Sequence, residues 1–340
     1  MATKEQIKES LDSILVPAIS RTLAGLNIIR EIEVNDGRVR INLASPALDE
    51  DTQNWIKMKA KETIGKLPEI TKVEVNFIEC APKDLNEVSN VIAVMSGKGG
   101  VGKSLVTALL AVALARQGKD VGILDADITG PSIPKMFGVG NMRPKGNEAG
   151  ILPVLSRSGI TIMSLNLILE HEDDAVIWRG PLIAGAIKQF WEEVLWGKLD
   201  YLLVDLPPGT ADASLTVMQT LPLSGVVIVF SPQELAAMVV RKSVQMAQTM
   251  GIPILGVVEN MSYLVLPDSG KKLELFGKSK AKDMAKAAGA PLLGQIPIDP
   301  ELAKLCDEGK IEQYQTDLTI SLADTMVKAL ATRGKVKQKA

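Results

Sequence analysis

Residues 91–104 read VIAVMSGKGGVGKS and carry the strongest indication of the fold. The first five residues are apolar and predict a buried strand, and residues 105–116 are good helix formers that predict a helix. Between the two, residues 97–104 match the pattern G-x-x-x-x-G-K-S/T of a phosphate-binding loop. A plain glycine-rich turn is the alternative, but the flanking strand and helix are the setting that such a loop requires. The stretch therefore predicts a P-loop nucleotide-binding domain.

The composition of the loop indicates how it would hold a triphosphate. Glycine tolerates positive φ and carries no side chain, so the backbone can curl around phosphate oxygens and point its N–H groups at them. The N-terminus of the following helix adds partial positive charge. Lys103 is predicted to reach the β- and γ-phosphates of ATP, and Ser104 to ligate Mg²⁺. The residues expected to contact nucleotide here are Gly97, Gly99, Gly100, Val101, Gly102, Lys103, Ser104 and Leu105.

Lys98 is an additional lysine at the second position of the loop. A lysine at this position marks the deviant Walker A class, which residues 98–104 resemble closely. In that class the lysine reaches across a dimer interface to phosphate bound by the other subunit. The resemblance thus implies a nucleotide-sandwich homodimer, and a solvated loop lysine is the alternative interpretation.

Composition limits the remaining possibilities. The 340 residues are 46% hydrophobic and 4% aromatic, which is enough for one large or two smaller domains with an aliphatic core. The formal net charge of −2 argues against binding nucleic acid by bulk charge. Two cysteines exclude a disulfide framework and suit a reducing cytosol. No secretory signal and no apolar stretch of membrane-spanning length is seen, so a cytoplasmic protein without a transmembrane segment is expected.

Residues 1–80 are predicted to form a small α+β domain of order α-β-β-α-β. Thr3 opens a helix-capping box, and the NDG of residues 35–37 fits a hairpin turn between two strands. Asp51 is expected to cap the second helix. Residues 81–89 are polar, contain a proline and are predicted to be a linker.

Residues 90–340 are predicted to form the P-loop ATPase domain. Apolar, strand-like runs recur along it, and helical stretches separate most of them. This alternation predicts a doubly wound, mostly parallel α/β sheet with helices on both faces. The runs are Val121–Leu124, Ile160–Met163, Tyr201–Val204, Val226–Phe230, Ile254–Val258 and Pro291–Ile296.

Acidic residues stand at the ends of two of these runs. Asp205 ends an apolar strand, as a Walker B carboxylate does, and is predicted to hold Mg²⁺ beside the loop. Gly209 is expected to present its N–H to the γ-phosphate. Asp125 and Asp127 follow another strand, where ligands bind in open α/β sheets, and Asp127 is predicted to orient the attacking water. Helix or turn capping is the alternative for each carboxylate.

Four longer motifs resemble one known family. Residues 91–104, the DADITGPSIP of residues 125–134, the WRGP of residues 178–181 and the LDYLLVDLPPGT of residues 199–210 look like the Mrp/ApbC iron–sulfur carrier ATPases. These are grouped with MinD, ParA and the nitrogenase iron protein. Residues 3–78 look like the small iron–sulfur assembly domain often fused ahead of bacterial Mrp proteins. The resemblance covers nearly the whole chain and implies an ATPase that acts with iron–sulfur assembly or client proteins.

The resemblance also assigns roles, position by position. It makes Asp127 the switch I carboxylate and places Asp205 and Gly209 in switch II. It implies that Asn260 hydrogen-bonds the adenine ring and that the segment with Pro297 lies against the base, a buried turn asparagine being the alternative for Asn260. The predicted catalytic residues are then Lys98, Lys103, Asp127 and Asp205.

The chain departs from the family at the cluster site. Family members carry two cysteines shortly after Asn-Met-Ser, which meet across the dimer and give four thiolates for a 4Fe–4S cluster. Leu266 and Ser269 stand at these positions here. Leucine cannot ligate iron and a serine hydroxyl is a poor ligand, so the usual bridging cluster is not expected.

The other soft ligands in the sequence do not replace those thiolates. A dimer offers at most two Cys80 or two Cys306 thiolates at one place, which falls short of four. The apolar neighbours of Cys306 are typical of a buried structural thiol. The lone His171 is interpreted as a solvated loop residue rather than a metal ligand.

Two functions stay open at this point. One is an ATP-dependent protein of iron–sulfur maturation, either a carrier by unusual ligation or a cluster-free accessory. The other is a nucleotide-gated binding module of the MinD/ParA type, with a protein or membrane partner and no metal role. Both predict slow, Mg²⁺-dependent ATP hydrolysis that is lost on Lys103→Ala or Asp127→Ala.

Overall fold

The computed structural model describes residues 2–17, 19–127, 130–168, 180–209, 212–233 and 236–337. His171 and the motif positions Ile128, Thr129, Trp178, Arg179 and Thr210 lie outside the described residues. The chain divides into two compact units. The first comprises Met1–Ser89, Arg143–Leu155 and Gln189–Asp200, and the second comprises Asn90–Met142, Ser156–Lys188 and Tyr201–Ala340.

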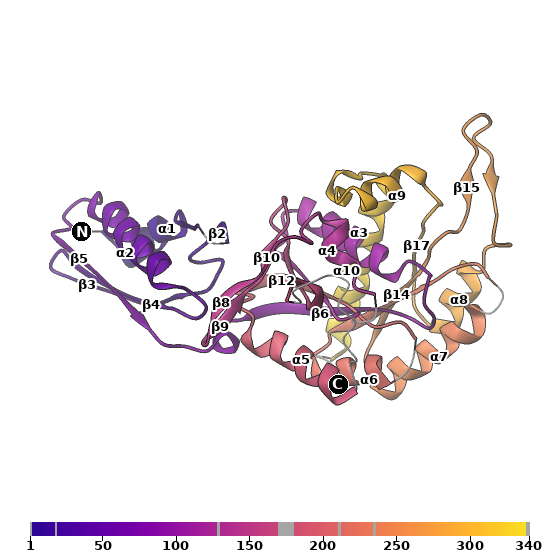
Figure 1. The fold of residues 1–340 in the computed structure, drawn as a ribbon, viewed down its shortest axis with the longest axis horizontal. Coiled ribbons are helices and arrows are strands. Elements are labelled where there is room, and N and C mark those ends of the chain that lie inside the picture. Colours follow the sequence, from indigo (N-terminus) through magenta and orange to yellow (C-terminus); the bar gives the residue numbers. More distant parts are fainter. Residues whose placement is uncertain are drawn as a thin grey trace. The chain divides into compact units, whose positions relative to one another are not determined.

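The first unit packs two helices with a three-stranded sheet (Figure 1). In the sheet order β3-β4-β5, β3 runs antiparallel to β4 and β4 runs parallel to β5. The predicted order α-β-β-α-β is confirmed, with a short β1–β2 ladder added before the first long strand. The elements are α1 (Lys4–Asp12), β1 (Leu15–Val16), β2 (Arg21–Thr22), β3 (Ile29–Asn35), β4 (Arg38–Ala44), α2 (Glu50–Gly65), β5 (Lys72–Ile78) and the 3₁₀ helix η1 (Pro82–Asp84).

Local signals account for most of these elements. Thr3 caps α1 through the predicted capping box. Asp36 and Gly37 have φ angles of 46° and 75°, as the tight turn between β3 and β4 requires. The expectation that Asp51 caps α2 is wrong. Asp49 has that role, because its backbone is extended and its side chain accepts a hydrogen bond of 2.8 Å from Thr52 N, whereas Asp51 already lies in the first turn.

Two later segments of the chain also belong to the first unit. One holds the hairpin of β8 (Lys145–Asn147) and β9 (Gly150–Leu152) and the short β10 (Val154–Leu155). The other is fastened by Arg21, whose guanidinium donates to the carbonyls of Trp196 and Lys198 at 2.6 and 2.9 Å. Residues 81–89, predicted as a linker, contain η1, the fully buried Leu85 and the start of the next strand. The domain limits 1–80 and 90–340 stay a prediction.

The second unit is organised around a large, mostly parallel sheet. From β11 onward, its strand order is β11-β7-β12-β6-β13-β14-β17. The β11–β7, β7–β12, β6–β13, β13–β14 and β14–β17 pairs are parallel, as the alternating sequence pattern predicted. The strands are β6 (Glu87–Ser96), β7 (Val121–Asp125), β11 (Thr161–Ser164), β12 (Lys198–Asp205), β13 (Gly225–Phe230), β14 (Ile254–Glu259) and β17 (Leu292–Gln295).

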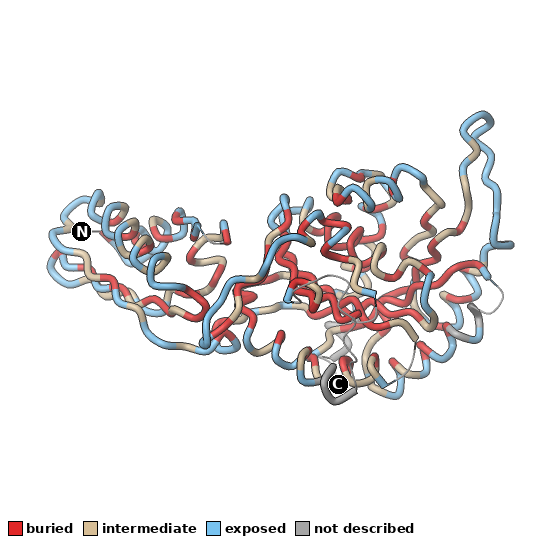
Figure 2. Tube along the Cα trace, in the orientation of Figure 1, coloured by how far each residue is buried: buried red, intermediate tan, exposed pale blue. Residues whose placement is uncertain are grey.

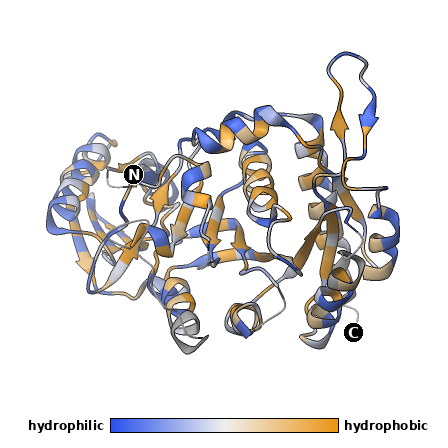
Figure 3. Cartoon of the chain, turned by 45° about the vertical axis from the view of Figure 1, so that its right-hand side comes forward, coloured by the Kyte–Doolittle hydropathy of each residue, from blue (hydrophilic) through white to orange (hydrophobic). Residues whose placement is uncertain are grey.

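Helices cover both faces of this sheet, with α3, α4 and α9 on one side and α6, α7 and α8 on the other (Figure 1). The sheet strands are mostly buried in Figure 2 and predominantly apolar in Figure 3, so the core lies between the sheet and its helices. The helices are α3 (Lys103–Arg116), α4 (Ile133–Met136), η2 (Leu165–Leu167), α5 (Gly180–Glu193), α6 (Asp212–Thr220), α7 (Ala236–Thr249), α8 (Ala281–Ala288), α9 (Pro300–Asp307), η3 (Ile311–Gln313) and α10 (Asp317–Lys337). Among the described residues, no helix combines the length and the apolar character needed to cross a membrane.

Two features of this unit position candidate functional residues. Three neighbouring strands end in polar residues at one level of the sheet, because Ser164 of β11 and Asp205 of β12 are the register partners of Asp125 on β7. A small hairpin, β15 (Leu264–Val265) and β16 (Lys272–Leu273), projects away from the sheet (Figure 1). The first feature lies at the carboxyl edge of the strands, where ligands bind in open α/β folds.

Candidate nucleotide site

The predicted phosphate loop runs from the end of β6 to the first turn of α3. Gly100 and Gly102 have φ angles of +77° and +79°, in the left-handed region that favours glycine. Gly102 is the N-cap of α3, so the loop delivers the helix N-terminus to the sheet edge. A Cβ atom on Gly102 would overlap the side-chain amide nitrogen of Asn260. The glycine at this position is therefore required by both its backbone angle and its surroundings.

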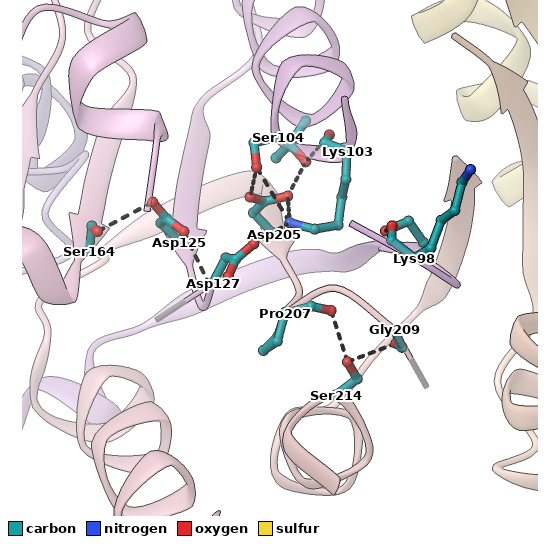
Figure 4. A network of polar contacts seen from close by, with 12 residues as sticks. Lys98, Lys103, Ser104, Asp125, Asp127, Ser164, Asp205, Pro207, Gly209 and Ser214 are labelled. Atoms are coloured by element: carbon teal, nitrogen blue, oxygen red, sulfur yellow. Dashed lines mark hydrogen bonds and ion pairs between the residues drawn. The ribbon is translucent and has the colours of Figure 1, made fainter. Parts of the chain in front are cut away.

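Lys103 lies between two of the predicted carboxylates (Figure 4). Its Nζ is 2.7 Å from Asp205 Oδ1 and 3.4 Å from Asp127 Oδ2. The lysine side chain is only 4% exposed and that of Asp205 is completely buried. A buried ammonium is retained only with such partners, since an unpaired buried charge is strongly unfavourable. The structure thus brings together three of the four residues predicted to be catalytic.

Asp205 also accepts hydrogen bonds from two hydroxyls of α3. The Ser104 hydroxyl donates to one carboxylate oxygen, and the Thr107 hydroxyl donates to the other at 2.9 Å. Burial raises the pKa of Asp205, and Lys103 and these hydrogen bonds oppose that rise. Sequence reasoning missed Thr107. The sequence feature that could have pointed to Thr107 is a hydroxyl residue one turn after Ser104, among the apolar residues of the predicted helix.

Asp125 lies deeper than Asp127, at the end of β7. One of its oxygens accepts from the backbone N–H of Asp127 at 3.2 Å and the other from the Ser164 hydroxyl at 3.3 Å. Burial and the nearby charge of Asp205 hold the pKa of Asp125 well above its usual range, against the opposing effect of Lys103. Asp125 is therefore a local turn cap, as its alternative interpretation had it, and also part of a polar group that reaches Lys103.

Lys98 points away from Lys103 in Figure 4. Its ammonium donates to the side-chain oxygen of Gln233, which lies after β13. Its backbone carbonyl accepts a hydrogen bond of 2.9 Å from Ser96 Oγ. The side chain is thus held by a neighbouring loop of the same chain, and its predicted reach to another subunit stays a prediction.

Gly209 lies in the turn after β12, with a φ of +88°. Its N–H donates to the Ser96 carbonyl at 3.0 Å, so it points back at the strand that leads into the phosphate loop. Ser214 of α6 holds the same turn through hydrogen bonds to the carbonyls of Pro207 and Gly209, at 2.9 and 3.1 Å. The predicted contact of Gly209 with a γ-phosphate remains a prediction.

Asn260 follows β14 and is 1% exposed. Its amide nitrogen donates to the Val101 carbonyl at 2.9 Å, which fastens the phosphate loop to the end of β14. The segment with Pro297 runs beside it, because Ser262 N donates to the Ile296 carbonyl and Ile298 N to the Tyr263 carbonyl, at 2.9 and 2.7 Å. Asn260 and Pro297 thus come from adjacent segments, and their predicted contact with adenine is untested.

The magnesium ligands predicted from sequence fit that ion. Ser104 and Asp205 offer a hydroxyl and a carboxylate oxygen in direct hydrogen-bond contact, and hard oxygen ligands are what Mg²⁺ prefers. Leu105, the residue after Ser104, has an apolar side chain and can offer Mg²⁺ no side-chain oxygen.

An iron–sulfur cluster does not fit the donors at its expected place. Leu266 and Ser269 lie in the turn between β15 and β16, where neither supplies a thiolate. The two cysteines, Cys80 and Cys306, are both half-buried, and burial with the nearby Asp307 raises the pKa of the Cys306 thiol to about 11. Within the described ranges, no three His, Cys, Asp or Glu side chains are grouped so as to hold a metal ion.

Comparison with known families matches both parts of the chain. The family described as NUBPL iron-transfer P-loop NTPase matches residues 87–332, and the family described as iron–sulfur cluster assembly protein matches residues 4–77. An iron–sulfur cluster carrier protein of Clostridium perfringens is 47% identical over 234 residues, covering 67% of this chain and 82% of its own. One of Aquifex aeolicus is 37% identical over 329 residues, covering 89% of this chain and 88% of its own.

Solved structures agree with this assignment. A nucleotide-binding protein of Archaeoglobus fulgidus in complex with ADP is 50% identical, with a TM-score of 0.62 over 68% of this chain and 90% of its own. The cell-division ATPase MinD of Pyrococcus furiosus, at 21% identity and a TM-score of 0.51 over 71% of this chain and 99% of its own, shares the fold. From the family matches and these relatives together, the chain belongs to the NUBPL iron-transfer P-loop NTPase family.

Proposed function

We propose that this protein binds ATP with Mg²⁺, hydrolyses it slowly, and acts in iron–sulfur cluster carriage or assembly as a nucleotide-switched homodimer. The observation that carries the ATPase part is the placement of Lys103 between Asp205 and Asp127, at the N-terminus of α3. A cation, two carboxylates and a helix N-terminus at one point are what phosphoryl transfer needs, because the protein mainly positions groups and compensates charge.

Each residue has a distinct part in this proposal. The ammonium of Lys103 leaves its ion pairs for the β- and γ-phosphates, and the loop N–H groups hold the remaining phosphate oxygens. Ser104 and Asp205 would hold Mg²⁺, which neutralises charge on the phosphate oxygens. Asp127 orients the attacking water, because its carboxylate is only 3.4 Å from the lysine that contacts the γ-phosphate.

The homodimer part rests on Lys98. Its resting contact with Gln233 is a single hydrogen bond between a lysine and a neutral amide. A phosphate of a nucleotide held by a second copy is a stronger partner for the ammonium, since charge-assisted hydrogen bonds are about twice as strong as neutral ones. Closure of two copies around ATP would then release Gln233 and expose a different surface to a client protein.

The iron–sulfur part is supported by family membership and by the relatives named iron–sulfur cluster carrier protein. The hairpin tip with Leu266 and Ser269 favours a second candidate, a nucleotide-gated binding module of the MinD/ParA type without a metal role. Anaerobic incubation with iron and sulfide, followed by gel filtration and iron counting, separates them. Protein-bound iron that survives gel filtration supports carriage, and iron near zero supports the second candidate or a cluster-free accessory.

The ATPase part is tested by Mg²⁺-dependent phosphate release and by calorimetric ATP binding. Lys103→Ala is expected to abolish hydrolysis, since it removes the cation that balances the phosphate charge. Lys119→Ala, an exposed lysine just after α3, is the matched control and should behave as wild type. Equal rates in wild type and Lys103→Ala would refute the assignment of the site.

A further inference from the structure

Asp125 is a buried carboxylate to which the ATPase proposal gives no task. It is 1% exposed, and its two oxygens are bound separately. Oδ1 accepts from the backbone N–H of Asp127 at 3.2 Å, and Oδ2 accepts from the Ser164 hydroxyl at 3.3 Å. Figure 4 shows the resulting chain of contacts: Ser164 contacts Asp125, Asp125 contacts Asp127, and Asp127 contacts Lys103.

The sheet fixes where this carboxylate lies. Asp125 is the last residue of β7, between its register partners Ser164 on β11 and Asp205 on β12. Parallel strands on both sides hold its backbone, and the fully buried Ser164 hydroxyl holds its side chain. Few rotamers can satisfy two donors from opposite directions, so the carboxylate is a fixed point at the sheet edge.

Asp127 has a different situation, because it lies beyond the end of β7. Its neighbour Ala126 still donates to the Asp205 carbonyl at 2.9 Å, as the last backbone bond toward β12. The N–H of Asp127 itself donates to the Asp125 side chain rather than to a strand. The position of the Asp127 backbone, and with it the 3.4 Å approach of its carboxylate to Lys103 Nζ, is thus set in part by Asp125.

We propose that Asp125 and Ser164 are positioning residues for ATP hydrolysis, which hold Asp127 where it can orient the attacking water. The inference rests on the proposed ATPase function. Neither residue touches nucleotide in this proposal: Ser164 fixes Asp125, and Asp125 fixes Asp127. Misplacing a reacting group by about 1 Å can cost on the order of a hundredfold in rate, so a deep hydrogen bond can matter without any substrate contact.

The test compares kcat, KM and ATP affinity in purified full-length variants. Asp125→Ala removes the acceptor for the Asp127 N–H and should lower kcat about tenfold or more, with ATP affinity within about twofold of wild type. Asp125→Asn keeps an oxygen acceptor in the same place and should restore kcat to within about threefold of wild type. Ser164→Ala should lower kcat about fivefold, because Asp125 is left intact but less firmly held.

Thr161→Val is the matched control for Ser164→Ala. Thr161 carries an equally buried hydroxyl three residues earlier on β11, and this hydroxyl also bonds β7, at the Val121 carbonyl. Its removal should leave kcat unchanged. An effect of Thr161→Val equal to that of Ser164→Ala would mean that β11 matters only for stability, which would overturn the inference.

The outcomes separate this inference from the proposed function. If wild type hydrolyses ATP and Asp127→Ala does not, but Asp125→Ala keeps the wild-type kcat, only the inference fails. If Asp125→Asn is as impaired as Asp125→Ala, with ATP binding reduced in the same proportion, the carboxylate is merely structural. If wild type shows no Mg²⁺-dependent hydrolysis, the proposed function itself is wrong. Should Asp125→Ala not fold, Asp125→Asn and Ser164→Ala still decide the question.

Discussion

The phosphate loop keeps the residues of the family pattern, whereas the tip of the β15–β16 hairpin departs from it. Around the loop, Lys103, Ser104 and Asp205 are all present and make direct contacts with one another. At the hairpin tip, Leu266 and Ser269 replace the two thiolates that the resemblance implies. The loop is surrounded by buried partners that constrain it, whereas the tip is half-exposed at Leu266 and exposed at Ser269. A change at the tip therefore alters chemistry with little cost to the fold, while a change at the loop disturbs both.

Restoring thiolates at the tip is the change with the largest expected effect. The double variant Leu266→Cys with Ser269→Cys should bind about two more iron atoms per chain than wild type after anaerobic reconstitution, as one four-iron cluster shared by two chains requires. The positions project on a hairpin, so a second copy can supply the other two thiolates. Iron counting and the visible absorption of the cluster measure the gain.

Leu266→Ala with Ser269→Ala is the control for the cysteine pair. It changes the same two positions without adding a ligand and should bind no more iron than wild type. If the cysteine pair also stays free of iron while remaining folded, then more than two residues separate this hairpin from a cluster site. In that case the hairpin tip would lack the backbone geometry of a cluster site as well as its thiolate ligands, whereas the phosphate loop has both the geometry and the residues of a nucleotide site.

The sequence predicted the strand–loop–helix setting and the strands that end in carboxylates, because those signals are local. It could not supply partners that the sheet order creates. Ser164 reaches Asp125 across 39 positions of sequence, and Thr107 reaches Asp205 across 98. The cap of α2 was missed for a different reason: Asp49, Glu50 and Asp51 are consecutive acidic residues, and only the backbone angles select Asp49. Residues 189–200 join the first unit through backbone carbonyls bound by Arg21, which leave no sequence signal.

A glycine substitution tests how tightly the loop is constrained. Gly102→Ala should weaken ATP binding by about tenfold or more, because a left-handed backbone costs an L residue roughly 1–2 kcal/mol and the new methyl overlaps the Asn260 amide. Calorimetric titration with Mg²⁺ and ATP measures the loss. Gly118→Ala is the matched control, since Gly118 has a φ of +74° after α3 but nothing within 4 Å of its added Cβ. Equal losses in both variants would assign the effect to backbone strain alone.

The smallest expected effect concerns the free energy of unfolding. It measures how much the buried carboxyl of Asp125, at the end of β7, lowers the stability of the fold. Asp125 has a folded-state pKa raised by burial and by Asp205. A carboxyl with a raised folded pKa binds its proton more tightly in the folded protein, so its contribution to stability is fully present below the unfolded pKa of about 4 and is lost as pH rises toward the folded pKa. Asp125→Asn removes this titration. The variant should therefore unfold a few degrees above wild type at pH 7.5, where about 1 kcal/mol corresponds to roughly 2–4 °C, and closer to wild type at pH 4.5.

Thermal unfolding of the nucleotide-free protein at the two pH values measures this difference. Ser269→Ala provides the comparison from the tip, where an exposed hydroxyl should leave the melting temperature unchanged at both. If Asp125→Asn instead melts below wild type at pH 7.5, then the nearby positive charge of Lys103 outweighs the burial of the Asp125 carboxylate, and the pKa of Asp125 lies below rather than above the usual range. The carboxylate would then stabilise the fold as well as position Asp127. If the variant melts higher and keeps kcat within about threefold of wild type, hydrolysis needs the oxygen acceptor at position 125 and not its ionisable carboxyl, whose burial then only lowers stability, a burden that no group at the hairpin tip carries.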